Sequence, residues 1–270
     1  MLCAALGLSL AACSGSGGAG LFGGSQRPDS IDSDELQFQP PQEGDPVATI
    51  STSLGDISVV LYPQYAPLAV ENFTALAQQG YFDGIVFHRV EKDFIIQSGD
   101  ATGTGRSGAS IWDNASYPNE ITGMLRHYAG ALATANAADG SVGNLSQFYI
   151  VSSPVGSVDR AAATTLTEAG LDESVVDAYR AAGGAPYLDG LDTVFGQVYS
   201  GMDVVDAINA VETDDGGRPL EDVTILSVTV GTYSAAAQPQ DASGSSPQNA
   251  AASSPPASEP AAAVPSSSAA

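Results

Sequence analysis

The chain has 270 residues, eight of them basic and 31 acidic, which gives a formal net charge of −23 at pH 7. Such an excess of negative charge repels nucleic-acid phosphates and anionic lipid head groups, so nucleic-acid binding is not expected. Its two cysteines, Cys3 and Cys13, both lie near the N-terminus, so we expect no disulfide in the body of the protein.

The first twelve residues are apolar over a stretch too short to cross a bilayer, which needs about 20 residues, but typical of a secretory signal. They end in Leu10-Ala11-Ala12-Cys13, which resembles the lipobox of bacterial lipoproteins. The resemblance implies a signal peptide over residues 1–12, cleavage before Cys13 and acylation of Cys13, with fatty acids such as palmitate. We therefore expect an extracytoplasmic protein, lipid-anchored to the cell membrane. No basic residue precedes the apolar run, so an incidental cysteine in an ordinary apolar N-terminus is the alternative.

Two segments of low complexity flank the rest of the chain. Residues 13–46 are rich in Gly and Ser and then acidic, with apolar residues that follow neither a helical nor a strand period, which favours a flexible linker. From residue 235 onward the chain consists almost entirely of Ala, Ser, Pro, Gln and Gly, which bury too little apolar surface to offset the entropy of ordering. We predict one folded domain over residues 47–232 and a disordered tail over 233–270.

Short apolar runs separated by turn residues fill the predicted domain. Residues 47–61 alternate apolar and polar positions around Leu54-Gly55-Asp56, which predicts a β-hairpin. Pro67 opens a stretch with apolar residues at helical spacing, and Gly80 ends it. Further strands are expected at 85–90, 94–97, 129–133, 148–151, 193–198 and 223–230, and further helices at 173–182 and 202–211. The pattern favours a mainly β fold, an antiparallel barrel closed by helices.

Two patterns that could indicate other chemistry lack the necessary context. Residues 103–108 match the glycine-rich dinucleotide fingerprint, but residues 110–120 show no helical period, and a helix has to follow that fingerprint. The two histidines, His88 and His127, have no cysteine near them and no G-x-S-x-G segment accompanies them. We therefore expect no metal, no cofactor and no hydrolase triad.

Several motifs, in order along residues 47–230, resemble the cyclophilin family. They are Tyr81-Phe82-Asp83-Gly84, Phe87-His88-Arg89-Val90, Phe94-Ile95-Ile96-Gln97-Ser98-Gly99-Asp100, Ala135-Asn136-Ala137, Ser146-Gln147-Phe148-Tyr149-Ile150, Leu188-Asp189-Gly190 and Val194-Phe195-Gly196. The resemblance implies an eight-stranded antiparallel barrel capped by two α-helices, with a substrate groove on its outer face and peptidyl-prolyl cis-trans isomerase activity. A longer connection than the family core needs, residues 154–186, carries the extra short helix.

The resemblance also implies roles for individual residues. The catalytic arginine corresponds to Arg89 and the groove glutamine to Gln97. The proline pocket corresponds to Phe94, Ile95, Tyr149 and Leu188, bordered by Tyr187 and Asp192, and the positions that hold the peptide backbone are Ala135, Asn136, Ala137 and Gln147. Many family members carry tryptophan in place of Tyr187, histidine in place of Asp192 and methionine in place of Ile95. A carboxylate beside an apolar pocket is costly to desolvate, so Asp192 is expected either to lower the activity or to shift the substrate preference.

The expected chemistry follows from the peptide bond, whose partial double-bond character gives a rotation barrier of about 18–20 kcal/mol. A guanidinium placed against the prolyl nitrogen can donate a hydrogen bond to the lone pair that develops as the bond twists. We expect the protein to be a monomer, and its expected partners are proline-containing unfolded or nascent exported proteins. One alternative is a non-catalytic module that binds proline-containing peptides, as a chaperone or an adhesin. Another is a cytoplasmic isomerase, which acylation of Cys13 would exclude.

Overall fold

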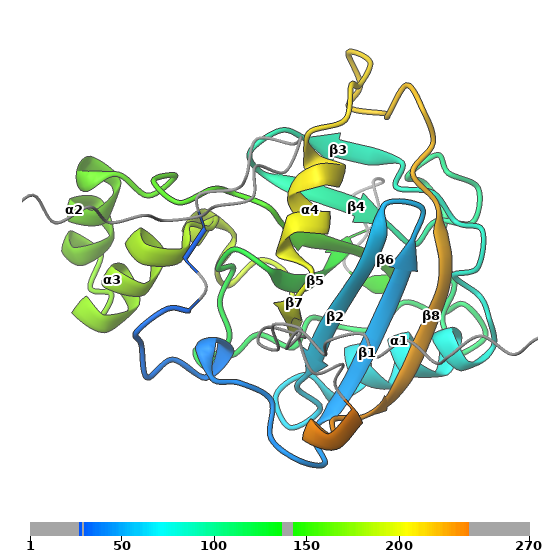
Figure 1. Ribbon diagram of the computed structural model, residues 1–270, viewed down its shortest axis with the longest axis horizontal. Helices are drawn as coiled ribbons and strands as arrows, with labels where there is room; N and C mark the ends of the chain where they lie inside the picture. Colours follow the sequence, from blue (N-terminus) through cyan, green and yellow to red (C-terminus); the bar gives the residue numbers. More distant parts are fainter. Residues whose placement is uncertain (1–26, 29, 137–142, 238–270) are drawn as a thin grey trace, which may run out of the picture. The chain divides into compact units, whose positions relative to one another are not determined.

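The computed structural model describes residues 27–28, 30–136 and 143–237 (Figure 1). The predicted signal peptide, Cys13, Ala137 and nearly all of the predicted tail lie outside these residues. The strands are β1 (Pro46–Thr52), β2 (Gly55–Leu61), β3 (Arg89–Glu91), β4 (Ile95–Ser98), β5 (Ala131–Asn136), β6 (Asn144–Val151), β7 (Val194–Ser200) and β8 (Ile225–Thr232). The α-helices are α1 (Pro67–Gln78), α2 (Arg160–Glu168), α3 (Glu173–Ala182) and α4 (Met202–Asn209). Within the described ranges, no helix combines the length and the apolar character needed to cross a bilayer.

The eight strands form one antiparallel sheet in the order β3-β4-β6-β5-β7-β2-β1-β8. The edges of this sheet approach each other, because the chain just before β3 pairs with the start of β8. Gly84 and Phe87 donate their N–H groups to the carbonyls of Ile225 and Val223, and Ile225 donates to Ile85. The predicted eight-stranded antiparallel fold is therefore confirmed, as a curled sheet whose edges are joined by loop hydrogen bonds.

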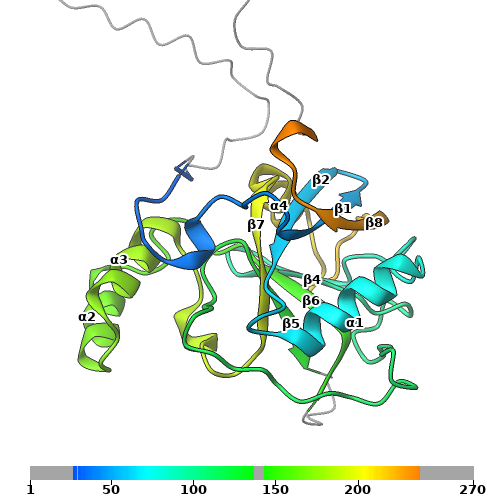
Figure 2. The ribbon, with the colours of Figure 1, turned by 90° about the horizontal axis from the view of Figure 1, so that it is seen from below.

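The core of the barrel follows from the alternation along each strand. Ile50 in β1 and Ile57 in β2 are fully buried, and Phe73 of α1 packs its ring on Phe148 and Phe195. Helix α1 contacts β6 and β8 (Figure 2), whereas α4 contacts β2, β3 and β4 (Figure 1). Both helices begin where the sequence pattern predicted them. Together they bury the apolar side chains on the inner face of the sheet.

Two helices, α2 and α3, lie in the connection between β6 and β7, where the sequence pattern predicted only one (Figure 1). The predicted helix is α3, and its bounds are confirmed. Helix α2 was missed because its apolar face is short: only Ala163 is buried in it, and only Ala162 and Leu166 pack beside Ala163 on the same cluster. Its start is set instead by Asp159, whose carboxylate accepts the N–H of Ala162 at 2.8 Å. The two helices form the inserted hairpin, with an apolar cluster of its own.

The described residues before β1, numbers 27, 28 and 30–45, form a strap that lies against the domain (Figure 1). Gln37 is 4% exposed; its amide donates to Gln197 Oε1 at 2.8 Å, and its oxygen accepts the N–H of Arg126 at 2.7 Å. The ring of Phe38 lies 4.7 Å from that of Tyr128. This part of the predicted linker is therefore packed, because individual side chains meet specific partners without any periodic pattern along the sequence.

Candidate functional site

A line of paired residues crosses four neighbouring strands on one face of the sheet. Arg89 of β3 lies opposite Gln97 of β4, Gln97 lies opposite Tyr149 of β6, and Tyr149 lies opposite Ala133 of β5. Directly opposed residues of antiparallel strands share a face. The adjacent line belongs to the barrel core and consists of Val90, Ile96, Ile150 and Leu132. Arg89 and Gln97 therefore lie on the outer face, where the resemblance placed a groove.

Buried amides hold the guanidinium of Arg89 in place. Arg89 Nη1 donates to Gln97 Oε1 at 3.0 Å, and Nη2 forms an ion pair with Glu91. Gln97 Nε2 donates to Gln147 Oε1 at 2.9 Å, and Gln147 Nε2 donates to the carbonyl of Ser107 at 2.8 Å. The Arg89 side chain is 39% exposed, whereas both glutamines are buried. Since a guanidinium carries five N–H donors, these two bonds leave it able to donate to a molecule in the groove.

The loop that supplies the Ser107 carbonyl is built around Asp100, which is 1% exposed. Its carboxylate accepts backbone N–H bonds of 2.8 to 3.3 Å from Thr102, Thr104, Arg106 and Ser107. Burial raises the pKa of Asp100, but these hydrogen bonds outweigh burial, and the net pKa lies below its usual value. The glycine-rich residues 103–108 thus surround an internal carboxylate, and turns rather than a helix follow them. Through the Ser107 carbonyl, the loop supports the chain of amides that holds Arg89.

An apolar patch lies beside Arg89 on the same face. Ile95 and Tyr149 are 3% and 4% exposed, and both belong to a cluster against which Phe94 and Leu188 pack. All four predicted pocket residues are therefore brought together. The ring of Tyr187, which is 65% exposed, lies 5.7 Å from the ring of Phe94 at the edge of this patch. The arrangement offers a small apolar surface next to a cation.

Asp192 bonds to one residue of the patch and to one of the positions predicted to hold the peptide backbone. Its carboxylate accepts the hydroxyl of Tyr149 at 2.9 Å and the side-chain amide of Asn136 at 2.6 Å. Burial raises the pKa of Asp192 above its usual value, and the bond from Tyr149 opposes this shift. Ala135 is buried on the neighbouring strand, while Ala137 lies outside the described residues. A partly desolvated carboxylate thus borders the pocket.

Three residues of this site were not singled out from the sequence: Glu91, Ser107 and Asp189. Glu91 follows Arg89 by two positions in β3, so strand alternation alone places both side chains on one face. Ser107 contributes its backbone carbonyl, which no side-chain pattern reveals. Asp189 belongs to the Leu188-Asp189-Gly190 motif and lies beside the pocket residue Leu188, but the motif does not reveal that its carboxylate accepts the N–H of His127 and the hydroxyl of Tyr179.

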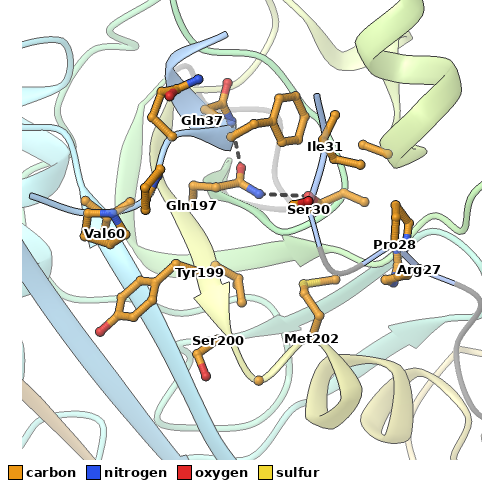
Figure 3. A pocket seen from close by; sticks show the side chains of 18 of the residues that line it. Arg27, Pro28, Ser30, Ile31, Gln37, Val60, Gln197, Tyr199, Ser200 and Met202 are labelled. Atoms are coloured by element: carbon orange, nitrogen blue, oxygen red, sulfur yellow. Dashed lines mark hydrogen bonds between the residues drawn. The ribbon is translucent and has the colours of Figure 1, made fainter. Parts of the chain in front are cut away.

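A cavity of about 690 Å³ lies elsewhere, between the strap and the end of β7 with the start of α4 (Figure 3). Its lining includes Arg27, Gln37, Gln197, Tyr199 and Met202, and Figure 3 shows the hydrogen bond between the two glutamines. No described residue of the predicted groove lines it. Among the residues that the structure describes, no three His, Cys, Asp or Glu side chains are grouped so as to hold a metal ion.

Comparisons with known proteins agree on one family. The family model described as cyclophilin type peptidyl-prolyl cis-trans isomerase/CLD matches residues 47–230. A putative peptidyl-prolyl cis-trans isomerase of Staphylococcus aureus (strain COL) is 40% identical over 189 residues, which cover 70% of this chain and 93% of that protein. A putative bifunctional phosphatase/peptidyl-prolyl cis-trans isomerase of Streptococcus pyogenes serotype M6 is 42% identical over 187 residues, 68% of this chain but only 38% of that longer protein. Among solved structures, the chain is similar to a cyclophilin type peptidyl-prolyl cis-trans isomerase of Cryptosporidium parvum, which was crystallised in the presence of the dipeptide Ala-Pro. The TM-score is 0.55 and the sequence identity 26%, and the match covers 69% of this chain and 99% of that one.

Proposed function

The chain belongs to the cyclophilin-type peptidyl-prolyl cis-trans isomerase family, and we propose that the outer groove beside Arg89 is its isomerase site, acting on exported proteins at the outer face of the membrane. The observation that carries the site is the line of Arg89, Gln97 and Tyr149 across β3, β4 and β6. It sets an oriented guanidinium next to an apolar patch of the size of a few side chains. A proline ring on that patch would bring its nitrogen toward the cation.

Arg89 acts as a hydrogen-bond donor in this mechanism. In the planar peptide bond the nitrogen lone pair is delocalised, and it localises on the nitrogen as the bond twists. A donor aimed at that nitrogen therefore binds the twisted state more strongly than the planar state, which lowers the barrier. The bonds from Arg89 to Gln97 and Glu91 orient the donor before the substrate arrives. The step requires no proton transfer and no covalent intermediate.

The apolar patch contributes in two ways. Phe94, Ile95 and Leu188 offer contact to the proline ring, and they exclude water from the nitrogen, which strengthens the bond from Arg89. Asp192 borders the same patch with both carboxylate oxygens engaged by Tyr149 and Asn136. Its negative charge is expected to favour peptides that carry a cation or a hydrogen-bond donor near proline.

The proposed location rests on the lipobox-like sequence that ends in Cys13. Isomerisation of X-Pro bonds takes tens of seconds without a catalyst, which is slow enough to limit the folding of a newly exported chain. Clients would be unfolded or nascent proteins with exposed proline, met by an isomerase that works as a monomer.

The activity is tested by the cis-to-trans isomerisation of an X-Pro tetrapeptide with the full chain. We expect acceleration by the wild-type protein and its near-complete loss in Arg89→Ala. Folded wild-type protein that binds the peptide without accelerating its isomerisation would favour the non-catalytic module instead.

The anchor is tested by labelling with radioactive palmitate in the native host. We expect label on the wild-type protein and on Cys3→Ala, no label on Cys13→Ala, and accumulation of the precursor with globomycin. Label that survives Cys13→Ala, or a chain that carries none, would refute lipid attachment at Cys13 without affecting the assignment of the isomerase.

A further inference from the structure

Asp189 joins several segments of the domain through one carboxylate. Its Oδ1 accepts the backbone N–H of His127 at 2.9 Å and lies 3.0 Å from His127 Nδ1. Its Oδ2 accepts the hydroxyl of Tyr179 at 2.7 Å and a longer bond from Arg126 at 3.3 Å. Burial raises the pKa of Asp189, but the hydrogen bonds outweigh it, so the net pKa is lowered and the carboxylate stays ionised. Asp189 is therefore a fixed acceptor at the centre of a polar network.

The same residue lies in the loop 186–192, which carries three residues of the proposed groove: Tyr187, Leu188 and Asp192. Tyr187 and Leu188 immediately precede Asp189, and Asp192 follows it by three positions. Whatever holds the Asp189 carboxylate in place consequently also limits where these three side chains can lie.

One of the groups that hold it comes from the inserted hairpin. Tyr179 belongs to α3, is fully buried, and packs its ring 4.4 Å from that of Tyr128. The end of α3 is tied down as well, because Gly183 accepts the N–H of Ala129 at 3.1 Å. The Tyr179 hydroxyl is thus presented from a rigid element.

A second path leads from the same carboxylate to the floor of the pocket. The ring of His127 is stacked on that of Tyr149, with centroids 6.1 Å apart and planes at 19°. Tyr149 in turn donates its hydroxyl to Asp192. The contacts from α3 to the pocket are therefore continuous, through Tyr179, Asp189, His127 and Tyr149.

We infer that the inserted hairpin buttresses the substrate groove, with Tyr179 as a positioning residue that fixes the loop 186–192 through Asp189. The role of the hairpin is to hold the wall of the proline pocket in its binding position, so it acts on the affinity for proline-containing peptides rather than on the donor Arg89. This inference rests on the proposed isomerase site.

The chain offers a matched pair of variants to test it. Tyr179→Phe removes the hydroxyl that bonds to Asp189, whereas Tyr128→Phe removes, from the same buried cluster, a hydroxyl that has no hydrogen-bond partner among the described residues. Burial is the main cause of the raised pKa of Tyr128, and the nearby carboxylates of Glu35 and Asp189 add to it without making a hydrogen bond of acceptable geometry to the Tyr128 hydroxyl. Both variants keep the aromatic rings and hence the packing of the hairpin.

Three measurements on the full chain separate positioning from stability: steady-state isomerisation of an X-Pro tetrapeptide, thermal unfolding, and amide hydrogen exchange. For Tyr179→Phe we expect KM to rise about threefold to tenfold with kcat within about twofold, roughly the effect of one lost hydrogen bond. We also expect faster exchange at Leu188, Asp189 and Leu191, whose amides donate to carbonyls in the loop or in the residue just before it. Tyr128→Phe should match the wild-type protein in KM and in loop exchange.

The inference would be refuted if the two variants had the same KM and the same loop exchange, or if Tyr179→Phe matched the wild-type protein in both. If the wild-type chain proves inactive, the isomerase proposal fails. The exchange comparison, with titration of the dipeptide Ala-Pro in place of KM, then still decides whether Tyr179 positions the loop.

Discussion

Replacing Arg89 by alanine is expected to remove catalysis while leaving the fold nearly as stable as before. The Arg89 and Glu91 side chains are 39% and 41% exposed, and exposed ion pairs of this kind contribute about 0–1 kcal/mol. Gln97 Oε1 loses its donor, but removal of the partly exposed Arg89 side chain opens this oxygen to water, and Gln97 Nε2 keeps its bond to Gln147. We therefore expect the free energy of unfolding to fall by no more than about 1 kcal/mol, which corresponds to a Tm shift of about 2–4 °C in a domain of this size.

The effect on activity is expected to be far larger. A single donor aimed at developing charge in a water-poor site contributes about 2.7–4 kcal/mol, which is a factor of roughly 10²–10³ in rate. Arg89→Lys keeps the positive charge, but an ammonium cannot bond Gln97, Glu91 and a prolyl nitrogen in the planar geometry of a guanidinium. It should therefore lose at least about tenfold.

The decisive assay compares kcat/KM for an X-Pro tetrapeptide with thermal unfolding, on the full chain and both variants. An Arg89→Ala protein that keeps more than about a tenth of the wild-type kcat/KM would refute the role of the guanidinium as the donor. A large loss of both activity and Tm would refute the estimate that Arg89 contributes little to stability.

Three further predictions concern stability. Gln37→Ala should lower the free energy of unfolding, measured by chemical denaturation, by about 1–3 kcal/mol because it leaves buried partners unsatisfied. Gln39→Ala, at an exposed position of the same strap, should change that free energy by less than about 0.5 kcal/mol. Equal losses in the two variants would contradict docking of the strap. Gly99→Ala should lower the melting temperature far more than Gly84→Ala, although both glycines have positive φ. A Cβ at Gly99 would lie 2.2 Å from a carbonyl oxygen, whereas one at Gly84 would meet nothing within 4 Å. Similar melting temperatures of the two variants would contradict this reasoning. Because its pKa is lowered in the folded state, Asp189 stabilises the fold above its unfolded pKa of about 3.9, and this stabilisation is lost as the pH falls through the folded value. The free energy of unfolding of Asp189→Asn should therefore depend less on pH in the acid range than that of the wild-type protein. An unchanged pH dependence would show that other carboxylates govern it.

Elements with one buried face were predictable from their pattern alone. The hairpin of β1 and β2, and helices α1 and α3, have apolar residues at the period of their own structure. The segment 85–90 was predicted as a strand, but the structure has only an isolated bridge at Val86 and β3 from Arg89. The short pairing of β3 with β4 explains the difference, because residues 85–87 bond instead to the start of β8.

What the sequence by itself determined is the set of side chains at the site and their grouping on two faces, since alternation along a strand decides which residues are buried in the barrel and which lie outside it. Which of these residues form the pocket, and that Arg89 is the donor, came from the resemblance to the cyclophilin motifs and not from the alternation. Only the tertiary structure decided which polar groups meet: Gln97 with Gln147, and Asp189 with Tyr179 of the inserted hairpin. Each of those contacts joins segments that no local period relates, because a hydrogen bond depends on the distance between two atoms in space and not on their separation along the chain.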